Sequence, residues 1–400
     1  MNADPENLFS DRTLLVIAPD FPDEENRYAG GLFVKHQLES ICRVFDRVLV
    51  IAPVPRSGGR VASDRLCHDY RYGNVEVRFP RALFIPRRLH LPLVDPVKLY
   101  LDRRIPVVER LIRNEEIRFD LVHAHFTWPS GGIAARLKER FGVPSVLTVH
   151  EDSRWLAEEV ASNHPLIERA LGAQDSIIRV NRADVGLLKS CNPRVVSIPN
   201  GYPPRFRPIE REDCRRRLGL PVDAKILFSL GNLIEQKGFE YLVQAMRHVA
   251  DCRDDVVCTI GGSGPLLGEL QHRIDELRLS DRVRLLGFVE DADIPIWMNA
   301  ADLFVMSSLS EGNPTVMFEA LGCATPFVGT NVGGIPEIIV SDEYGLLVEP
   351  SDPEGLARAI LVGLEKSWNR EAIADYSRQF SWDAIGQQIL REYARVLSGP

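Results

Sequence analysis

The five residues LLVIA, at positions 14–18, form an unbroken apolar run near the start of the chain. Such a run is typical of a strand buried on both faces, as in a parallel sheet covered by helices on both sides. Similar β-rich runs alternate with longer stretches of helical periodicity. They stand at residues 47–52, 121–123, 145–149, 195–198, 226–229, 256–260, 283–286, 303–305 and 327–328. This alternation predicts an α/β fold built from doubly wound parallel sheets.

The chain is long enough for two domains. It has 400 residues, of which 45% are hydrophobic and 26% charged, a composition typical of soluble globular proteins. Four prolines and a glycine interrupt regular structure at residues 199–208 (PNGYPPRFRP), and a new series of strands and helices follows. We therefore predict Rossmann-like domains over residues 1–203 and 204–381. The helical spacing of residues 382–400 predicts a last helix that crosses back to the first domain.

Charge and cysteine usage narrow the class of protein. The formal net charge of −8 argues against general nucleic-acid binding. The seven cysteines are odd in number, scattered and never spaced as CxxC, which disfavours both a disulfide framework and a zinc site. The first apolar run is too short for a signal peptide or a membrane span. We expect a cytoplasmic protein.

Three glycine loops follow predicted strands and precede helical patterns. Gly30 and Gly31 close the first loop, where paired glycines let backbone N–H groups approach an anion at a helix N-terminus. A phosphate or sugar site and an ordinary tight turn both remain open there. Gly262 and Gly264 belong to the second loop, whose GxGxxxG spacing departs from the GxGxxG of dinucleotide-binding proteins and weakens an NAD interpretation. The third loop, at residues 333–337, predicts a strand-to-helix turn.

Glu311 and Glu319 stand in the stretch SEGNPTVMFEAL, residues 310–321. We expect Asn313 to cap a helix that Pro314 opens, with Glu311 in the preceding loop and Glu319 in the second turn. Near a helix N-terminus both carboxylates should stay ionised and accept hydrogen bonds from sugar or ribose hydroxyls. A glycosidase would need one of them protonated, and nothing local in the sequence raises a pKa. Alternatively, the two glutamates have no ligand: one caps the helix and the other is a solvated side chain on its surface.

Basic and imidazole side chains supply further candidates. Lys237 stands at the start of a predicted helix, where it could meet phosphates as a point charge or lie on the surface. His123 and His125 alternate on one predicted strand, so both point to the same face, but no third ligand stands nearby and we expect no metal. The segment 78–104 carries seven basic and two acidic residues among apolar ones. It could contact an anionic membrane surface or a lipid-phosphate acceptor, or be a solvated loop and helix.

Taken in order, these landmarks resemble those of the retaining glycosyltransferases of group 1, family 4 of the sequence classification. The motifs that carry the resemblance run over nearly the whole chain: AGGLFVKHQLE, DLVHAHF, VLTVHED, SIPNGYPPRFRP, GNLIEQKGFEYLVQA, IGGSGP, RVRLLGFV, SEGNPTVMFEALGCATPFVGTNVGGIPEII, GLLVEPSDPEGLARAI and FSWDAIGQQ. Residues 311–319 match the family's E-x7-E motif. The resemblance implies a GT-B fold, in which two Rossmann-like domains face each other across a cleft. It also implies retaining, metal-independent transfer of a sugar from a UDP- or GDP-sugar to an acceptor hydroxyl, without a cofactor.

The resemblance also implies residue roles. His150 would hydrogen-bond the donor sugar, Lys237 would hold the diphosphate, and Glu311 would contact the sugar hydroxyls as the third catalytic residue. Glu319 would bind the ribose. The other donor-binding residues that it implies are Gly30 and Gly31 over the phosphates, Phe288 and Val289 beside the nucleobase, and Asn232, Gly262, Gly264, Asn313, Pro314, Thr315 and Val316.

One position departs from the family pattern. The family usually has an arginine where this chain has Asn232, and asparagine cannot supply the bidentate charge of a guanidinium. A non-catalytic subunit that binds sugar nucleotides therefore stays open as an alternative, as does a GT-B-like nucleotide-sugar epimerase. Glycans, lipid-linked sugars and small molecules all remain candidate acceptors, in a pathway such as glycan, glycolipid or cell-envelope polysaccharide synthesis. Contact with the inner face of the membrane and the oligomeric state also stay open.

Overall fold

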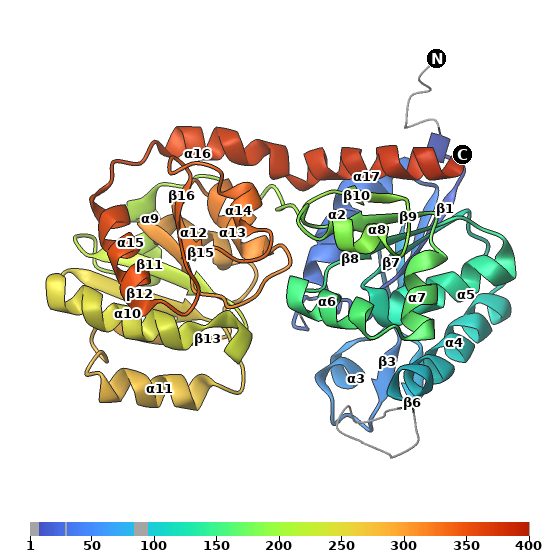
Figure 1. The fold of residues 1–400 in the computed structure, drawn as a ribbon, viewed down its shortest axis with the longest axis horizontal. Helices are drawn as coiled ribbons and strands as arrows, with labels where there is room; N and C mark the ends of the chain where they lie inside the picture. The colour runs from blue at the N-terminus through green and yellow to red at the C-terminus, as the bar shows by residue number, and fades with distance from the viewer. Residues whose placement is uncertain (1–7, 29, 84–94, 400) are drawn as a thin grey trace. The chain divides into compact units, whose positions relative to one another are not determined.

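The computed structural model describes residues 8–28, 30–83 and 95–399. The chain forms two compact units (Figure 1). The first comprises Met1–Pro199 together with Trp382–Pro400, and the second comprises Asn200–Ser381. The predicted boundary, between residues 203 and 204, falls just inside the second unit. The last helix, α17 (Trp382–Leu397), is part of the first unit.

The first unit is built on an eight-stranded sheet in the order β10-β9-β8-β7-β1-β2-β5-β4, within its described residues. Neighbouring strands are parallel except β4 and β5, which are antiparallel. The strands of this sheet are β1 (Thr13–Ile17), β2 (Arg47–Ile51), β4 (Tyr70–Tyr72), β5 (Val75–Arg78), β7 (Leu121–His125), β8 (Ser145–Val149), β9 (Ser176–Arg179) and β10 (Val195–Ser197). A separate parallel pair consists of β3 (Val54–Arg56) and β6 (Arg81–Leu83).

Helices cover both faces of this sheet. They are α2 (Leu32–Ile41), α4 (Pro96–Asn114), α5 (Gly132–Phe141), α6 (Ser153–Ala161), α7 (Pro165–Gly172), α8 (Val185–Lys189) and α17, with short helical turns at Cys42–Val44 and Thr127–Gly131. The short helix α3 (Ala62–Leu66) lies beside β3 (Figure 1). Along β1, Leu14 and Val16 pack into one core cluster and Leu15 and Ile17 into another. All four side chains are fully buried, so the run is covered on both faces as its composition predicts.

The second unit holds a six-stranded parallel sheet in the order β13-β12-β11-β14-β15-β16. Its strands are β11 (Lys225–Leu230), β12 (Val256–Gly261), β13 (Val283–Gly287), β14 (Leu303–Met306), β15 (Phe327–Thr330) and β16 (Gly345–Val348). Its helices are α9 (Arg211–Leu218), α10 (Phe239–Cys252), α11 (Leu267–Glu276), α12 (Ile294–Ala300), α13 (Thr315–Gly322), α14 (Ile335–Ile338), α15 (Pro353–Glu365) and α16 (Arg370–Ser377), with 3-10 turns at Glu235–Lys237 and Arg378–Phe380. In chain order the strands run 3-2-1-4-5-6, which is the Rossmann order.

Each sheet has a point where the strand order reverses. In the second unit it lies between β11 and β14, and in the first between β1 and β7. Loops that leave such neighbouring strands diverge, and open α/β sheets bind their ligands beyond the carboxyl ends of the strands at this point. The two reversal points therefore indicate where the candidate residues should be sought.

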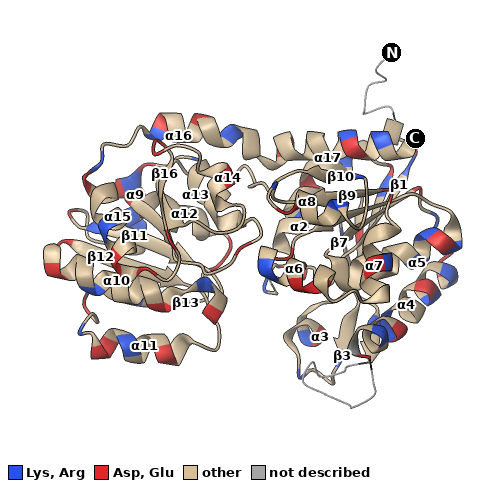
Figure 2. Cartoon of the chain, in the orientation of Figure 1, with Lys and Arg blue, Asp and Glu red and all other residues tan. Residues whose placement is uncertain are grey.

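The basic segment 78–104 falls only partly within the described residues, because residues 84–94 are outside them. The described part from residue 95 onward includes the first half of α4, which carries both basic and acidic side chains (Figure 2). Lys98 forms an ion pair with Asp102 one turn further along the helix. Part of the positive charge of this segment is therefore balanced locally.

The C-terminal helix is tied to the sheet of the first unit by a buried polar contact. The Tyr393 hydroxyl on α17 lies 2.5 Å from Nδ1 of His123 on β7, and Nε2 of His123 lies 2.7 Å from Oγ1 of Thr148 on β8. Both His123 and Tyr393 are fully buried. Burial lowers the pKa of His123 to about 3. A neutral ring satisfies both contacts by accepting from Tyr393 and donating from Nε2.

The buried His123 should make the protein less stable in mild acid. Its pKa is about 3 in the folded chain and 6.5 ordinarily, so between these values the unfolded chain binds more protons and stability falls as the pH falls. At pH 5.5 the loss for one such imidazole is about 1.4 kcal/mol. We expect His123→Gln to lose correspondingly less stability than the unmodified chain when denaturation at pH 7.5 and pH 5.5 is compared.

His68→Gln provides the control, because His68 belongs to the same unit and is exposed. Its loss of stability between the two pH values should match that of the unmodified chain. An identical pH response of the His123→Gln variant and the unmodified chain would contradict the assignment of a buried, neutral imidazole.

Candidate active site

Two predicted residues meet at the reversal point of the second unit. Lys237 ends the short turn that follows β11, and Glu311 lies in the loop that follows β14. The Lys237 ammonium donates to Oε1 of Glu311 at 2.6 Å, and the Ser308 hydroxyl donates to the same oxygen at 2.6 Å. Glu311 is 5% exposed. Its carboxylate is therefore held in place from two sides.

The two loops approach each other closely through their backbones. The Leu309 N–H donates to the Gln236 carbonyl at 2.8 Å. A Cβ on Gly238 would lie 2.2 Å from the Ser307 carbonyl oxygen, and one on Gly333 would lie 1.9 Å from that of Glu311. Both glycines also have positive φ angles, 59° and 54°. Glycine is therefore required at both positions to bring the loop of Glu311 against its neighbours.

The helix that follows Glu311 starts differently from the prediction. Pro314 is its N-cap residue and no side chain caps it, so the expectation that Asn313 caps this helix is wrong. The Asn313 amide is used elsewhere: Oδ1 accepts from the Asn200 N–H at 2.8 Å, and the Asn313 carbonyl accepts from the Asn200 side chain at 2.7 Å. Thr315 and Val316 form the first turn of α13, where backbone N–H groups and the helix dipole favour an anion.

Glu319 has an environment that the sequence did not indicate. It lies in the second turn of α13 as expected, but it is only 8% exposed. Burial raises the pKa of Glu319 to about 8; the positive charge of Arg205 opposes this shift, and Asp291 adds to it. Arg205 and Asp291 themselves form an ion pair at 2.6 Å. The expectation that Glu319 stays ionised is therefore wrong for the ligand-free protein at neutral pH.

The second glycine loop packs directly on the loop that contains Asn232. A Cβ on Gly262 would lie 1.8 Å from the Gly231 carbonyl oxygen, and one on Gly264 would lie 2.4 Å from that of Leu233. These glycines are therefore required by loop packing. Asn232, between Gly231 and Leu233, is exposed beside this contact.

The predicted nucleobase residues follow β13. The Gly262 N–H donates to the carbonyl of Gly287, the last residue of β13, at 2.7 Å, so this strand end joins the same group of loops. Phe288, the next residue, is 52% exposed, which is unusual for a large apolar side chain. Val289 lies against Gly261: a Cβ added to Gly261 would be 2.7 Å from a methyl group of Val289.

In the first unit, the predicted residues gather at the carboxyl ends of β1 and β8. Gly31 is the N-cap residue of α2 with a φ of 70°, and a Cβ there would lie 2.3 Å from the Asp20 carbonyl oxygen. Gly30 precedes it. Phe33, in the first turn of α2, has its ring centroid 4.7 Å from that of His150. The paired glycines and His150 thus lie around the same helix N-terminus.

His150 is partly buried and contacts a second imidazole. Its Nε2 lies 3.0 Å from Nδ1 of His125, which is fully buried. Burial lowers the pKa of both rings well below the ordinary value. Neither Nε2 of His125 nor Nδ1 of His150 has a hydrogen-bond partner among the described residues. Because one ring must donate to the other, the tautomer of His125 decides whether His150 offers a donor or an acceptor at Nδ1.

The predicted site residues therefore fall into two groups, one in each unit. Lys237, Glu311 and Glu319 belong to the second group, and His150 belongs to the first. Sequence reasoning missed two residues. Ser308 donates a hydrogen bond to Glu311, and the positive charge of Arg205 opposes the rise in the pKa of Glu319. Arg205 stands in the proline-rich stretch PNGYPPRFRP, where its charge was a usable signal, whereas Ser308 gave none.

Two further properties bear on the class of protein. Nowhere in residues 8–28, 30–83 and 95–399 do three or more His, Cys, Asp or Glu side chains gather as a metal site would require. None of the helices in the described part of the chain combines the length and hydropathy of a membrane span.

Two family profiles match the chain, one in each unit. Residues 210–380 match the family described as glycosyl transferases group 1, and residues 31–185 match the glycosyl transferase 4-like domain. A D-inositol 3-phosphate glycosyltransferase of Streptomyces bingchenggensis is 30% identical over 309 residues, which cover 70% of this chain and 68% of that protein. TuaC of Bacillus subtilis, named for teichuronic acid biosynthesis, is 29% identical over 358 residues, 86% of this chain and 88% of TuaC.

Solved structures share the fold over nearly the whole chain. Sucrose-phosphate synthase from Thermosynechococcus elongatus matches with a TM-score of 0.78 and 21% identity, over 97% of this chain and 100% of that one. Anabaena HepE in complex with UDP-glucose matches with a TM-score of 0.70 and 21% identity, over 96% and 100%. Together with the two Rossmann-like sheets and the family profiles, these matches show that the chain belongs to the group 1 glycosyltransferases and has the GT-B fold.

Proposed function

We propose that this glycosyltransferase moves a hexose from a UDP- or GDP-sugar to an acceptor hydroxyl with retention at the anomeric carbon, without a metal ion. The acceptor belongs to a growing glycan, glycolipid or cell-envelope polysaccharide. The observation that carries the proposal is the contact between Lys237 and Glu311 at the reversal point of the second sheet. The buried carboxylate of Glu311 accepts hydrogen bonds from sugar hydroxyls, and the ammonium group of Lys237 beside it binds phosphate.

The second unit provides the groups that a nucleoside diphosphate needs. The Lys237 ammonium is balanced by Glu311. An incoming diphosphate gives this ammonium a second anionic partner and leaves the carboxylate available to hydroxyl donors. Backbone N–H groups of Thr315 and Val316, at the positive end of α13, add donors without a further charged side chain. Phe288 and Val289 offer an apolar surface to the base, and Glu319 accepts from the ribose.

The reaction requires charge stabilisation and positioning more than a nucleophile. The bond between the anomeric carbon and the diphosphate oxygen breaks, and negative charge grows on the leaving diphosphate, where Lys237 and the amides of α13 stabilise it. The acceptor oxygen forms the new bond on the same face. The departing diphosphate oxygen takes the proton of the acceptor hydroxyl. His150 and the Gly30–Gly31 backbone hold the transferred sugar, so a covalent enzyme intermediate is unnecessary.

The comparisons support the donor class. The HepE structures are described as complexes with UDP, with UDP and glucose, and with UDP-glucose. The naming of TuaC for teichuronic acid biosynthesis favours a cell-envelope acceptor. The catalytic residues named above lie in the two segments that the family profiles match.

A second candidate function is binding of a sugar nucleotide without catalysis, as a subunit of a larger enzyme. Asn232 favours it, because an exposed amide stands where the family usually has a guanidinium. The transferase and the non-catalytic subunit would both bind the sugar nucleotide, but only the transferase would turn it over. A nucleotide-sugar epimerase would differ from both by altering the sugar without transferring it.

The first test is a panel of UDP- and GDP-sugars crossed with glycan, lipid-linked and small-alcohol acceptors, in the presence of EDTA. We expect one donor to release its nucleotide and to yield a glycosylated product with the anomeric configuration of the donor. Mass spectrometry detects the product, and NMR determines its anomeric configuration. In Lys237→Gln the rate should fall by roughly 100-fold, since it removes a charge that stabilises the leaving group.

Lys366→Gln is the control, because Lys366 belongs to the same unit and pairs with Asp342 at the surface. It should retain the full rate. Binding without turnover for every donor and acceptor would favour the subunit, and an altered free sugar would favour the epimerase. The absence of binding to any sugar nucleotide would overturn the proposal.

The role of position 232 can be tested by restoring the missing charge. We expect Asn232→Arg to bind the donor about tenfold more tightly, because a guanidinium beside the diphosphate adds a charged hydrogen bond. Calorimetric titration with the donor from the panel measures the change, and Asn232→Gln, which adds length without charge, should leave the affinity unaltered. Equal affinity of the arginine variant and the unmodified chain would show that position 232 does not face the diphosphate.

The raised pKa of Glu319 predicts a pH-dependent stability. The pKa of Glu319 is about 8 in the folded chain and 4.5 ordinarily, so between these values the folded chain binds more protons and stability falls as the pH rises. From pH 5 to pH 7.5 this loss is on the order of 3 kcal/mol. We expect Glu319→Gln to escape it in ligand-free denaturation experiments, while the exposed Glu269→Gln behaves as the unmodified chain. Parallel pH profiles for all three proteins would show that Glu319 is ionised after all.

A further inference from the structure

A cavity in the second unit lies at the opposite edge of the sheet from Lys237 and Glu311. It has a volume of about 440 Å³ and is formed around the amino-terminal ends of β11 and β14, by residues that include Lys225 and Asp302. The four-residue strand β14 separates Asp302 from the loop of Glu311, a span of about 13 Å. The cavity is therefore distinct from the proposed donor site, and its size is that of a small-molecule pocket.

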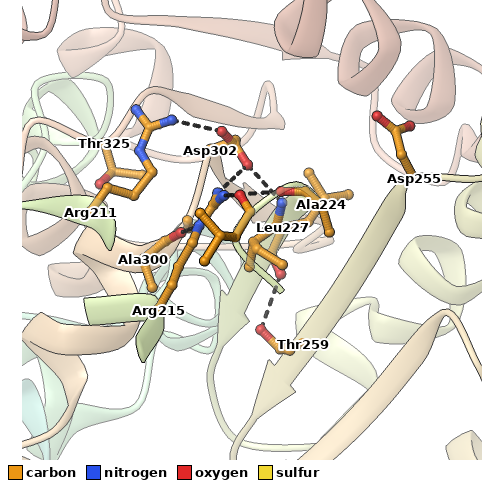
Figure 3. Close-up of polar contacts among 12 residues, drawn as sticks. Arg211, Arg215, Ala224, Leu227, Asp255, Thr259, Ala300, Asp302 and Thr325 are labelled. Carbon is orange, nitrogen blue, oxygen red and sulfur yellow. Dashed lines mark hydrogen bonds and ion pairs between the residues drawn. The ribbon is translucent and has the colours of Figure 1, made fainter. Parts of the chain in front are cut away.

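Arg215 forms the fixed part of the cavity (Figure 3). Its guanidinium donates to the carbonyls of Ala300, Val222 and Ala224 at 3.0, 2.7 and 3.0 Å and to Oδ2 of Asp302 at 2.6 Å. Its side chain is 6% exposed. Arg215 thus joins the end of α12 to the loop before β11, which is a structural role.

Asp302 is shared between two guanidinium groups. Its Oδ1 accepts from Arg211 at 2.8 Å, while its Oδ2 accepts from Arg215 and, at 2.7 Å, from the Ile226 N–H. Figure 3 shows Arg211 and Arg215 converging on this carboxylate from α9. The Arg211 side chain is 34% exposed, so part of its guanidinium remains accessible.

A third guanidinium reaches the same cavity without a carboxylate of its own. Arg370 donates to the carbonyl oxygens of Ala301 and Asp302 at 3.2 and 3.4 Å. Within the described residues, no ion pair joins Arg370 to an acid. Burial, together with the positive charges of Arg211 and Arg215, lowers the pKa of Arg370 to about 10. Two guanidinium groups therefore bind the Asp302 carboxylate, and a third binds backbone carbonyls beside it. An added anion would relieve the mutual repulsion of the three.

The other charged residues of the cavity define what else a ligand must carry. Glu210, Glu212 and Asp223 also line it, together with the basic Lys225, so the cavity as a whole is not simply basic. Glu212 lies on α9 and also contacts Arg216, outside the cavity. These carboxylates accept hydrogen bonds but repel a second anionic group. A ligand that fits both parts has one anionic group and several hydroxyl groups.

We propose that this cavity binds a small phosphorylated polyhydroxy compound of the sugar phosphate class. Its phosphate lies between Arg211 and Arg370, where planar guanidinium groups offer paired N–H donors. Its hydroxyls donate to the acidic side chains that line the cavity. The site does not depend on the catalytic proposal, because it shares no residue with the donor-binding group.

Calorimetric titration of the full chain with glucose 6-phosphate tests the proposal, with glucose and inorganic phosphate as separate probes. UDP and GDP are present in excess, so that binding at the nucleotide site is blocked. We expect saturable binding of glucose 6-phosphate, weaker binding of phosphate and none of glucose. Arg370→Gln and Arg211→Gln should each weaken the binding of glucose 6-phosphate by about tenfold. Arg217→Gln should not, because Arg217 stands on the same helix but pairs with Asp293 outside the cavity.

The absence of saturable binding, or equal binding in both cavity variants and the unmodified chain, would overturn the proposal. So would binding of glucose 6-phosphate that occurs without UDP and GDP but is lost in their presence, which would place it in the nucleotide site. Binding of glucose as tight as that of its phosphate would also overturn it. The denaturation midpoint of each variant verifies folding. If Arg370→Gln fails to fold, the more exposed Arg211→Gln decides the outcome.

Discussion

The position of the proposed donor-binding residues depends on one constraint, the reversal of strand order between β11 and β14. The helices that follow these two neighbouring strands pack on opposite faces of the sheet, α10 in the core around Leu227 and α13 in the core around Phe228. The connecting loops must therefore separate at the sheet edge, yet they remain tied by the contact between Leu309 and Gln236. Lys237 and Glu311 occupy the two sides of this separation. Their ion pair is a consequence of the topology, and the glycines around it keep the loops close enough to form it.

The parts of the structure that could be predicted are those whose signals are local. Residues 14–18 indicate a doubly covered strand because burial on both faces leaves no polar position in the run. The prolines of PNGYPPRFRP mark the region where the first unit gives way to the second, since proline and glycine disfavour helices and strands wherever they stand. The E-x7-E motif and the lysine before Gly238 are equally local, and the structure brings Lys237 and Glu311 into contact.

The parts that could not be predicted depend on partners far away in the chain. Asn313 looks like a helix cap, but Asn200, 113 residues earlier, takes its side chain. Glu319 looks solvated at its helical position, but it is buried, and that burial depends on the packing of the whole unit. The same is true of Asp302, whose two arginines come from a helix about 90 residues earlier in the chain. Sequence patterns describe periodicity and caps; they do not describe which distant group competes for a side chain.

The placement of α17 has a consequence for how the chain is made. Five buried side chains of α17, among them Trp382, Ile385 and Tyr393, complete a core whose other buried members come from the first 200 residues, and Tyr393 reaches His123 across 270 positions of sequence. Synthesis from the N-terminus releases the whole second unit before this helix exists. The first unit is thus completed only after the second has been translated, and a nascent chain on the ribosome carries an uncovered apolar surface around α2 until α17 has been made.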